Sequence, residues 1–260
     1  MINEQRTSTR RPVPDDLFGG RLRGAYLLDL EVIDLHDPAP HVRCVTMESS
    51  DLVDFEYTPG QDLMIEFPHG GRKVRRRYTI RRADPAVGIA EFEFELHNNG
   101  GAATRWAAEA TLGDHLSAIG PRGTMAVHRE ATAHVDATAH LFVADDSAMP
   151  AAFAMVEALP PHTPATALLV TPHGPLSRPG PNAAVADLRQ FWLEDTELEA
   201  TISGLDLALS VAAYVIGEHH LVRRASEHLA SAGLDDAAIS AKSYWRNDQP
   251  NAQHGEPARD

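Results

Sequence analysis

Residues 91–96 read Glu91-Phe92-Glu93-Phe94-Glu95-Leu96, a strict alternation of acidic and apolar side chains. Successive side chains of a β-strand point to opposite faces, so this stretch predicts a strand that buries the apolar face and turns three carboxylates outward. Further short β-rich segments surround it, separated by turn residues, which predicts a small antiparallel barrel. The expected strands are Tyr26–Ile33, His41–Glu48, Asp62–Phe67, Arg76–Arg82, Glu91–His97 and His115–Ile119.

The pattern changes in the second half of the chain, where apolar runs alternate with helical stretches. The expected strands are Ala139–Ala144, Ala165–Thr171 and Val211–Ile216, and the expected helices are Met149–Leu159, Val185–Leu193 and Leu221–Ala232. This alternation predicts a parallel α/β sheet with helices on both faces. We therefore expect domains at residues 23–130 and 137–250, a flexible lead-in at 1–22 and a disordered tail at 251–260.

The composition limits the class of protein. With 260 residues, of which 43% are hydrophobic, the chain is long enough for two ordinary domains. Its net charge of −14 argues against general nucleic-acid binding, because an acidic surface repels phosphate. Cys44 is the single cysteine, which excludes an internal disulfide, and no apolar run is long enough to span a bilayer. The N-terminus also lacks the apolar segment of a secretory signal, so we expect a cytoplasmic protein.

One stretch departs from this acidic average, because seven of the 23 basic residues lie within residues 72–82. One interpretation is an edge strand whose charges prevent sheets from aggregating. The other is a local anion site in an acidic molecule. The basic residues of this stretch are Arg72, Lys73, Arg75, Arg76, Arg77, Arg81 and Arg82.

Within this stretch, a strand over Arg76–Arg81 would place Arg76, Tyr78 and Ile80 on one face. An arginine and a tyrosine two residues apart suit one elongated ligand. The guanidinium can bind a diphosphate with two hydrogen bonds, while the phenol ring packs against a flat heterocycle. The hydroxyl of Thr79 suits the polar edge of that heterocycle. As a bare pattern, Arg-x-Tyr-Thr is common by chance.

A second feature follows the alternating strand, where His97 leads through Gly100 and Gly101 into a predicted helix, Ala102–Ala110. Free backbone N–H groups at a helix start form a diphosphate site, and glycines let a ligand approach closely. Taken alone, the glycine pair is typical of a plain strand-to-helix turn.

These residues belong to a longer series of motifs that resembles the siderophore-interacting protein family. That family comprises FAD-dependent ferric-siderophore reductases of the ferredoxin-reductase-like superfamily. The resemblance covers residues 20 to 250, roughly, and is specific because six motifs occur in order. They are Arg76-Arg77-Tyr78-Thr79-Ile80-Arg81, His97 with Gly101-Ala102-Ala103-Thr104-Arg105-Trp106-Ala107, Gly120-Pro121-Arg122-Gly123, Ala144-Asp145-Asp146-Ser147-Ala148-Met149-Pro150, Gly217-Glu218 with Val222-Arg223, and Tyr244-Trp245-Arg246.

The resemblance implies the fold class and the main cofactor. The fold would be an N-terminal antiparallel six-stranded FAD-binding β-barrel, followed by a C-terminal open parallel α/β NAD(P)-binding-like domain. Arg76 is implied near phosphate and Tyr78 near the isoalloxazine. The implied FAD-binding residues are Arg76, Tyr78, Thr79, Ile80, His97, Gly101, Ala102, Ala103 and Thr104.

The resemblance also implies an activity in which NADPH, NADH or a ferredoxin reduces FAD, and electrons pass to Fe(III) in a siderophore, releasing Fe(II). The implied NAD(P)H-binding residues are Asp145, Asp146, Ser147, Gly217, Glu218 and Arg223. The candidates for contact with the anionic ferric siderophore are Lys73, Lys242, Trp245 and Arg246. No catalytic proton donor is needed, because the chemistry belongs to the flavin. We expect a monomer.

Two departures from the family pattern concern the sites. Gly101-Ala102-Ala103-Thr104 stands where Gly-Pro-Ala-Ser is common, and Ala144-Asp145-Asp146-Ser147 where Gly-Asp-Glu-Thr is usual. Two other functions therefore stay open: a general flavin-dependent reductase or electron-transfer protein, and a non-enzymatic protein that binds flavin or ferric chelate. A protein-bound metal is not expected, because the histidines lack ligand spacing.

Overall fold

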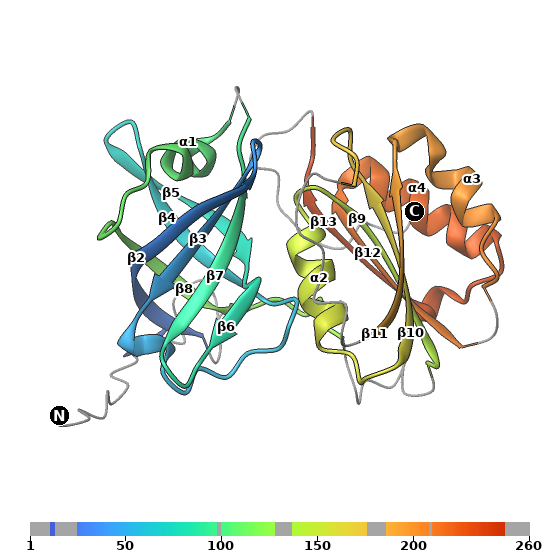
Figure 1. The fold of residues 1–260 in the computed structure, drawn as a ribbon, viewed down its shortest axis with the longest axis horizontal. Coiled ribbons are helices and arrows are strands. Elements are labelled where there is room, and N and C mark those ends of the chain that lie inside the picture. Colours follow the sequence, from blue (N-terminus) through green and yellow to red (C-terminus); the bar gives the residue numbers. More distant parts are fainter. Residues whose placement is uncertain are drawn as a thin grey trace. The chain divides into compact units, whose positions relative to one another are not determined.

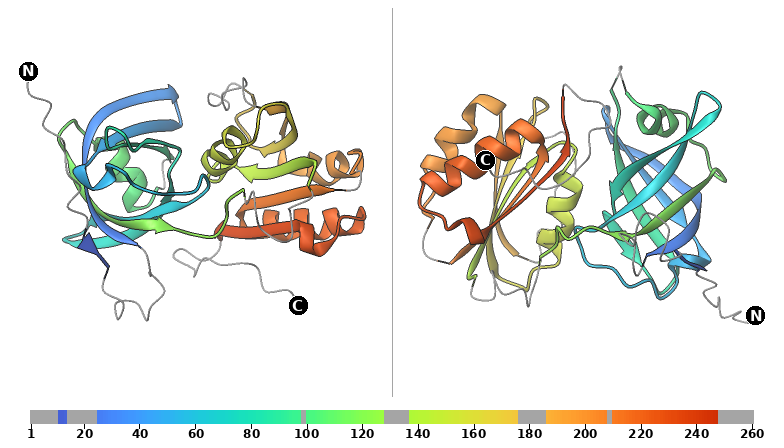
Figure 2. Two further views of the ribbon diagram at one scale, coloured as in Figure 1. Left: turned by 90° about the horizontal axis from the view of Figure 1, so that it is seen from below. Right: turned by 180° about the vertical axis from the view of Figure 1, so that it is seen from behind.

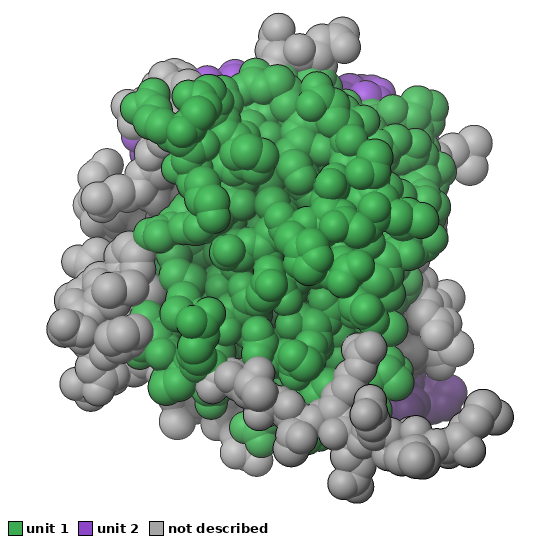
Figure 3. All heavy atoms as spheres, turned by 90° about the vertical axis from the view of Figure 1, so that its left-hand side faces the viewer, with its two compact units in different colours: residues 1–126 green, residues 127–260 purple. Residues whose placement is uncertain are grey.

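The computed structural model describes residues 11–13, 25–97, 100–127, 137–175, 186–207 and 210–247. The chain forms two compact units, residues 1–126 and residues 127–260 (Figure 3). Of the segments expected at the termini, only residues 11–13 of the lead-in are described, and the tail at 251–260 lies outside the described residues. No helix in the described part of the chain is long and apolar enough to cross a membrane.

The first unit is one antiparallel sheet of eight strands that curls into a barrel-like form (Figure 1). Its order is β5-β4-β8-β2-β3-β7-β6, and β1 pairs with β2. The strands are β1 (Arg11–Pro12), β2 (Tyr26–Ala39), β3 (Val42–Glu48), β4 (Asp62–His69), β5 (Arg72–Thr79), β6 (Arg82–Asp84), β7 (Ile89–Glu95) and β8 (His115–Arg122). Helix α1 (Ala102–Glu109) and the 3-10 turn η2 (Ser50–Leu52) complete the unit. All six expected strands are present, and β1 and β6 are additional.

The expected strand Arg76–Arg82 is interrupted, which corrects the sequence-based boundary. β5 ends at Thr79, where Ile80 donates its N–H to the Gln61 carbonyl (3.0 Å). The next residue, Arg81, donates its N–H to the Glu91 carbonyl (2.9 Å) instead. The chain therefore leaves one edge of the sheet at Ile80 and joins the other edge at Arg81, which closes the barrel at this corner.

The alternation at 91–96 is confirmed on its apolar face, since Phe92 and Phe94 are fully buried and Leu96 packs against the same core. The opposite face is less exposed than alternation suggests. Glu93 forms an ion pair with Arg81 at 3.2 Å, and their side chains are only 7% and 1% exposed. The corner described above brings this arginine over β7, and the pairing offsets the cost of burying either charge.

The second unit is a parallel sheet of five strands in the order β11-β10-β9-β12-β13. The strands are β9 (Ala139–Asp145), β10 (Thr163–Val170), β11 (Ala186–Leu193), β12 (Val211–Glu218) and β13 (Ile239–Trp245). Helix α2 (Met149–Glu157) covers one face, and α3 (Leu198–Ser203) and α4 (His219–Ser231) cover the other (Figures 1 and 2). The short 3-10 turns η3 (Asp195–Glu197) and η4 (Asp236–Ala238) precede α3 and β13.

The expected helix at Val185–Leu193 is wrong, because residues 186–193 form the edge strand β11. It pairs in parallel with β10 over its whole length, from Thr163 opposite Ala186 to Val170 opposite Leu193. The apolar positions here satisfy two periods: Leu188, Phe191 and Trp192 fit a helix, while Phe191 and Leu193 fit a strand. Pairing with β10 and burial of Phe191 and Leu193 against the core decide for the strand.

Candidate functional site

The start of α1 has no cap from its own N-cap residue. That residue is Gly101, with φ −71° and ψ −167°, and within the described part of the chain it brings no side-chain hydrogen bond to the first turn. A Cβ at Gly101 would meet nothing within 4 Å, so the position is open. At Gly100, by contrast, a Cβ would lie 2.3 Å from the Thr104 side chain, so only glycine fits there. The first N–H groups of a helix have no partner within the helix, and together they attract an anion.

A cluster of four rings connects this helix to the strand that carries Tyr78. The Tyr78 ring lies 4.2 Å from that of Phe94 and 5.7 Å from that of Phe67, between centroids. Trp106 of α1 contacts the same two rings, at 5.5 Å and 5.4 Å. Burial raises the pKa of the Tyr78 phenol, although the charge of Arg76 opposes the rise, so the hydroxyl stays neutral. Phe67 and Phe94 therefore fix Tyr78 and α1 relative to each other.

The other FAD-binding candidates lie around this cluster in different environments. Arg76 bonds through Nη1 to the Arg75 carbonyl at 2.8 Å. Thr79 is buried, and Ile80 belongs to the core. His97 is exposed, and its carbonyl accepts the Gly100 N–H at 3.0 Å. The expected alternation is observed, since Tyr78 and Ile80 pack on the core side.

On the opposite face, the basic residues are paired with acids. Arg77 forms a two-bond ion pair with the buried Asp62. Glu66 accepts from Arg75 at 2.7 Å and lies 3.5 Å from Lys73. β5 is also an edge strand of the sheet. The paired charges of Lys73, Arg75 and Arg77 therefore agree with the first interpretation, a protected edge strand. Arg76 and Tyr78 lie on the opposite face of the same strand.

In the second unit, the carboxyl ends of the parallel strands converge on Asp145, the last residue of β9. Its Oδ1 accepts from the Ser147 hydroxyl (2.6 Å) and the Ala148 N–H (3.1 Å). Its Oδ2 accepts from the Glu218 N–H (2.7 Å) and the Trp245 Nε1–H (3.0 Å). Burial raises the pKa of the Asp145 carboxyl, and the hydrogen bonds from Ser147, Trp245 and Glu218 offset part of that rise.

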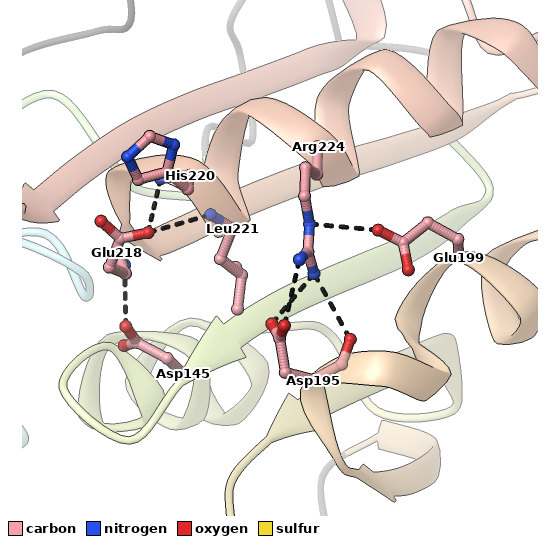
Figure 4. Close-up of polar contacts among 7 residues, drawn as sticks. All are labelled: Asp145, Asp195, Glu199, Glu218, His220, Leu221 and Arg224. Atoms are coloured by element: carbon pink, nitrogen blue, oxygen red, sulfur yellow. Dashed lines mark hydrogen bonds and ion pairs between the residues drawn. The ribbon is translucent and has the colours of Figure 1, made fainter. Parts of the chain in front are cut away.

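Helix α4 also begins at this edge, and its N-terminus is occupied by its own chain (Figure 4). The Glu218 carboxylate accepts the N–H groups of His220 (2.5 Å) and Leu221 (3.1 Å). Arg223, one turn further, pairs with Glu227 at 3.3 Å. The helix start that would otherwise attract a phosphate is thus capped by a carboxylate.

The helix expected at Met149–Leu159 is confirmed, since α2 starts at Met149 and ends at Glu157. Its N-cap residue is Ala148, and the Ser147 hydroxyl bonds to Asp145. Asp146 is only 8% exposed. Pro150 does lie in the first turn, where its missing N–H has no cost.

The four substrate candidates have unequal access. Lys73 is 65% exposed, and the Trp245 residue is 42% exposed. Lys242 is 8% exposed, with its ammonium 5.3 Å from the centre of the Tyr244 ring. Arg246 follows β13 and is half-buried. The structure therefore presents Lys73 and Trp245 to solvent and holds Lys242 inside the unit.

Sequence patterns missed two parts of these sites. Phe94 was expected only as a core residue and Phe67 only as the end of a strand, and their contacts with both Tyr78 and Trp106 depend on strand pairing. The four-donor environment of Asp145 had no local signal, because one of its donors lies 100 residues away.

A curled antiparallel sheet with a glycine-led helix start, joined in one chain to a five-stranded parallel α/β unit, is the ferredoxin-reductase-like fold. Two family models match the chain: "Siderophore-interacting FAD-binding domain" over residues 56–125 and "Siderophore-interacting protein" over residues 137–248. The chain belongs to the siderophore-interacting protein family.

Individual relatives agree with this assignment. The chain is 29% identical over 191 residues to the NADPH-dependent ferric-chelate reductase of Escherichia coli K12, covering 70% of each chain. It is 30% identical over 95 residues to the ferric acinetobactin reductase of Acinetobacter baumannii, covering 36% of this chain and 32% of that one. The crystal structure of the siderophore-interacting protein SipS from Aeromonas hydrophila matches with a TM-score of 0.70 at 26% identity, covering 86% of this chain and 93% of that chain.

Proposed function

We propose that this protein binds FAD in its first unit and uses it to reduce Fe(III) held by a siderophore. The observation that carries the proposal is the start of α1 at Gly101, which has no side-chain cap of its own. The aromatic cluster connects this helix, through Trp106, to Tyr78 within the matched FAD-binding domain. The names of the Escherichia coli and Acinetobacter baumannii relatives support a ferric chelate as substrate.

The residues around α1 fit the two chemically different ends of a flavin dinucleotide. The N–H groups of Ala102, Ala103 and Thr104 and the guanidinium of Arg76 suit the diphosphate. The neutral Tyr78 ring suits the flat isoalloxazine, with the Thr79 and Ile80 backbone beside it. His97 and Gly101 border the same helix start. When bound, FAD supplies the chemistry of accepting an electron pair and releasing single electrons.

The second unit would receive the electron donor at the carboxyl ends of its strands, the usual ligand edge of an open parallel sheet. The proposed contacts are Asp146, Ser147, Gly217, Glu218 and Arg223. Asp145 would hold this edge together from behind, because both of its carboxylate oxygens already accept hydrogen bonds within the protein. The name of the Escherichia coli relative favours NADPH. NADH and a reduced ferredoxin are the competing donors.

The substrate would be an anionic ferric chelate, for which Lys73, Lys242, Trp245 and Arg246 are the proposed contacts. Each Fe(III) takes up one electron and becomes Fe(II). The lower charge of Fe(II) weakens its attraction to hard oxygen ligands, so the chelate releases the metal. The protein's residues bind and orient the reactants, and none of them needs to transfer a proton.

Flavin binding is tested by reconstituting the purified protein with FAD and recording its absorption spectrum. Arg76→Ala combined with Tyr78→Ala should abolish binding, while Arg75→Ala on the opposite face should bind as the wild type does. Reduction of ferric catecholate and hydroxamate complexes is then compared across NADPH, NADH and reduced ferredoxin. A wild-type protein that never binds FAD would end the proposal.

The second candidate is a non-enzymatic protein that binds flavin or a ferric chelate. It is favoured because the Glu218 carboxylate already caps α4, so this helix start does not attract the phosphate of a nicotinamide donor. Rapid mixing of the flavin-loaded protein with each donor separates the two candidates. If no donor bleaches the flavin absorption, the binder is correct and the reductase is excluded. If donors bleach the flavin but quinones are reduced faster than ferric chelates, the protein is a general flavin-dependent reductase.

A further inference from the structure

We propose that Asp145 is a positioning residue that fixes the exposed indole of Trp245, so that the substrate meets a ring of set orientation. The inference rests on the proposed function for what the ring receives. It concerns the ends of β9, β12 and β13, which meet at one edge of the second unit.

The geometry shows that Asp145 acts within the protein and has no oxygen left for a ligand. Each of its two carboxylate oxygens accepts two hydrogen bonds, from Ser147 and Ala148 on one side and from Glu218 and Trp245 on the other. A carboxylate has about four acceptor positions, so all of them are used. The residue is also only 9% exposed.

The close approach of β12 is what lets Asp145 reach its neighbours. A Cβ at Gly217 would lie 2.7 Å from the Asp145 Cγ, and φ at this glycine is +137°. Only glycine combines that backbone conformation with that proximity. The next residue, Glu218, donates its N–H to Asp145 and caps α4 with its side chain (Figure 4). Asp145 therefore joins the end of β9 to the end of β12 and the start of α4.

The fourth bond extends this connection to β13. Trp245 is the last residue of β13 and is 42% exposed, unusual for so large an apolar side chain. Its Nε1–H bonds to Asp145 Oδ2, which anchors one edge of the indole in a residue that is partly open to solvent. An anchored ring loses little conformational freedom when a flat aromatic ligand stacks on it. The rings of a catecholate chelator are ligands of that kind.

The first test uses the protein without added ligand. The chain has three tryptophans, so its indole N–H signals are few, and Trp245→Phe assigns the signal of interest by its loss. We expect the Trp245 indole N–H of the wild type to exchange with solvent at least about tenfold more slowly than free indole. Asp145→Ala should abolish that protection. The matched control, Asp195→Ala, removes a carboxylate that pairs with Arg224 elsewhere in the unit and should leave it unchanged.

The second test measures turnover of a ferric catecholate complex by the FAD-loaded protein. Asp145→Ala and Trp245→Ala should each raise KM by about tenfold without changing FAD affinity. The double variant should be no worse than either single variant, because both remove the same oriented ring.

The outcomes distinguish this inference from the proposed function. Free-indole exchange in the wild type, unchanged protection in Asp145→Ala, or additive effects on KM would each overturn it. If Asp145→Ala fails to fold, the exchange rate of the Trp245 indole N–H in the wild type still tests whether the ring is anchored. A protein that shows no turnover but a protected Trp245 indole would refute the reductase while the positioning role of Asp145 stands.

Discussion

Two helices, α1 in the first unit and α4 in the second, begin at candidate binding edges, yet their first turns are chemically opposite. α1 begins after Gly101 with no side-chain cap. α4 begins after Glu218, whose carboxylate accepts two N–H groups of the first turn. The same backbone dipole is therefore available to an anionic ligand in one unit and already neutralised by the chain in the other. The comparison favours the first unit as the place where the proposed diphosphate would bind.

The largest expected effect comes from making α1 resemble α4. Gly101→Asp places a carboxylate at the open N-cap, where φ of −71° suits any residue and a Cβ has free space. We expect FAD affinity to fall at least about 100-fold, since the new side chain competes with the diphosphate. The control, Gly101→Ala, adds a methyl group without charge and should bind FAD nearly as the wild type does. Titration of FAD absorption or fluorescence measures the affinity of both variants. Equal affinities would show that a carboxylate at the start of α1 does not compete with FAD.

Gly217→Ala tests the tight edge in front of α4. The added methyl group would meet the Asp145 carboxyl in a backbone conformation that strains alanine. We expect the free energy of unfolding to fall by about 2 kcal/mol. Urea unfolding followed by circular dichroism measures it. Gly233→Ala, at φ +99° but with no atom within 4 Å of the added Cβ, separates backbone strain from the clash. Equal losses in the two variants would show that proximity to Asp145 is unimportant.

Removing the cap of α4 should cost less. Glu218→Ala leaves the His220 and Leu221 N–H groups without their carboxylate, which lowers the free energy of unfolding by about 1 kcal/mol. Gly101→Ala removes no side-chain hydrogen bond at the start of α1, so it should lower the free energy of unfolding by less than Glu218→Ala does. The same urea measurement on both variants checks the contrast. A Glu218→Ala protein as stable as the wild type would mean that the carboxylate is no effective cap.

The smallest effect concerns the basic strand β5. Burial tends to raise the pKa of Glu66, but hydrogen bonds and charges from Arg75 and Lys73 outweigh it, so the pKa lies below its usual 4.5. The ion pairs therefore stabilise the fold above that value, and their contribution is lost as pH falls through the lowered pKa. Since Arg75 and Lys73 are 41% and 65% exposed, we expect less than about 1 kcal/mol.

Unfolding of the wild type and Glu66→Gln between about pH 3 and pH 6 measures this contribution. The two proteins should converge in stability at the acid end. A constant difference over the whole range would show that Glu66 is not protonated there.

The candidate FAD site was more predictable than the donor edge. The spacing of Arg76 and Tyr78 gave their common face, and the structure confirms that Tyr78 and Ile80 pack inward. The helix at Ala102 was predicted within one residue of its observed end. At the donor edge, the sequence analysis did not identify Glu218 as the cap of α4. It also missed the four donors of Asp145, because strand order brings two of them close from 73 and 100 residues away.

By itself, the sequence determined the two-unit plan, the alternating strand at Glu91–Leu96 and the family. Each of these depends on periods or motifs a few residues long. The direction of a side chain follows from the period of its own helix or strand, so such patterns can be recognised without knowing the rest of the fold.

Only the tertiary structure decided that residues 186–193 form an edge strand, that Arg81 is buried with Glu93, and that Trp245 is anchored by Asp145. These outcomes depend on contacts between residues 12 to 100 positions apart. Strand pairing and burial fix such contacts, and no local period encodes them.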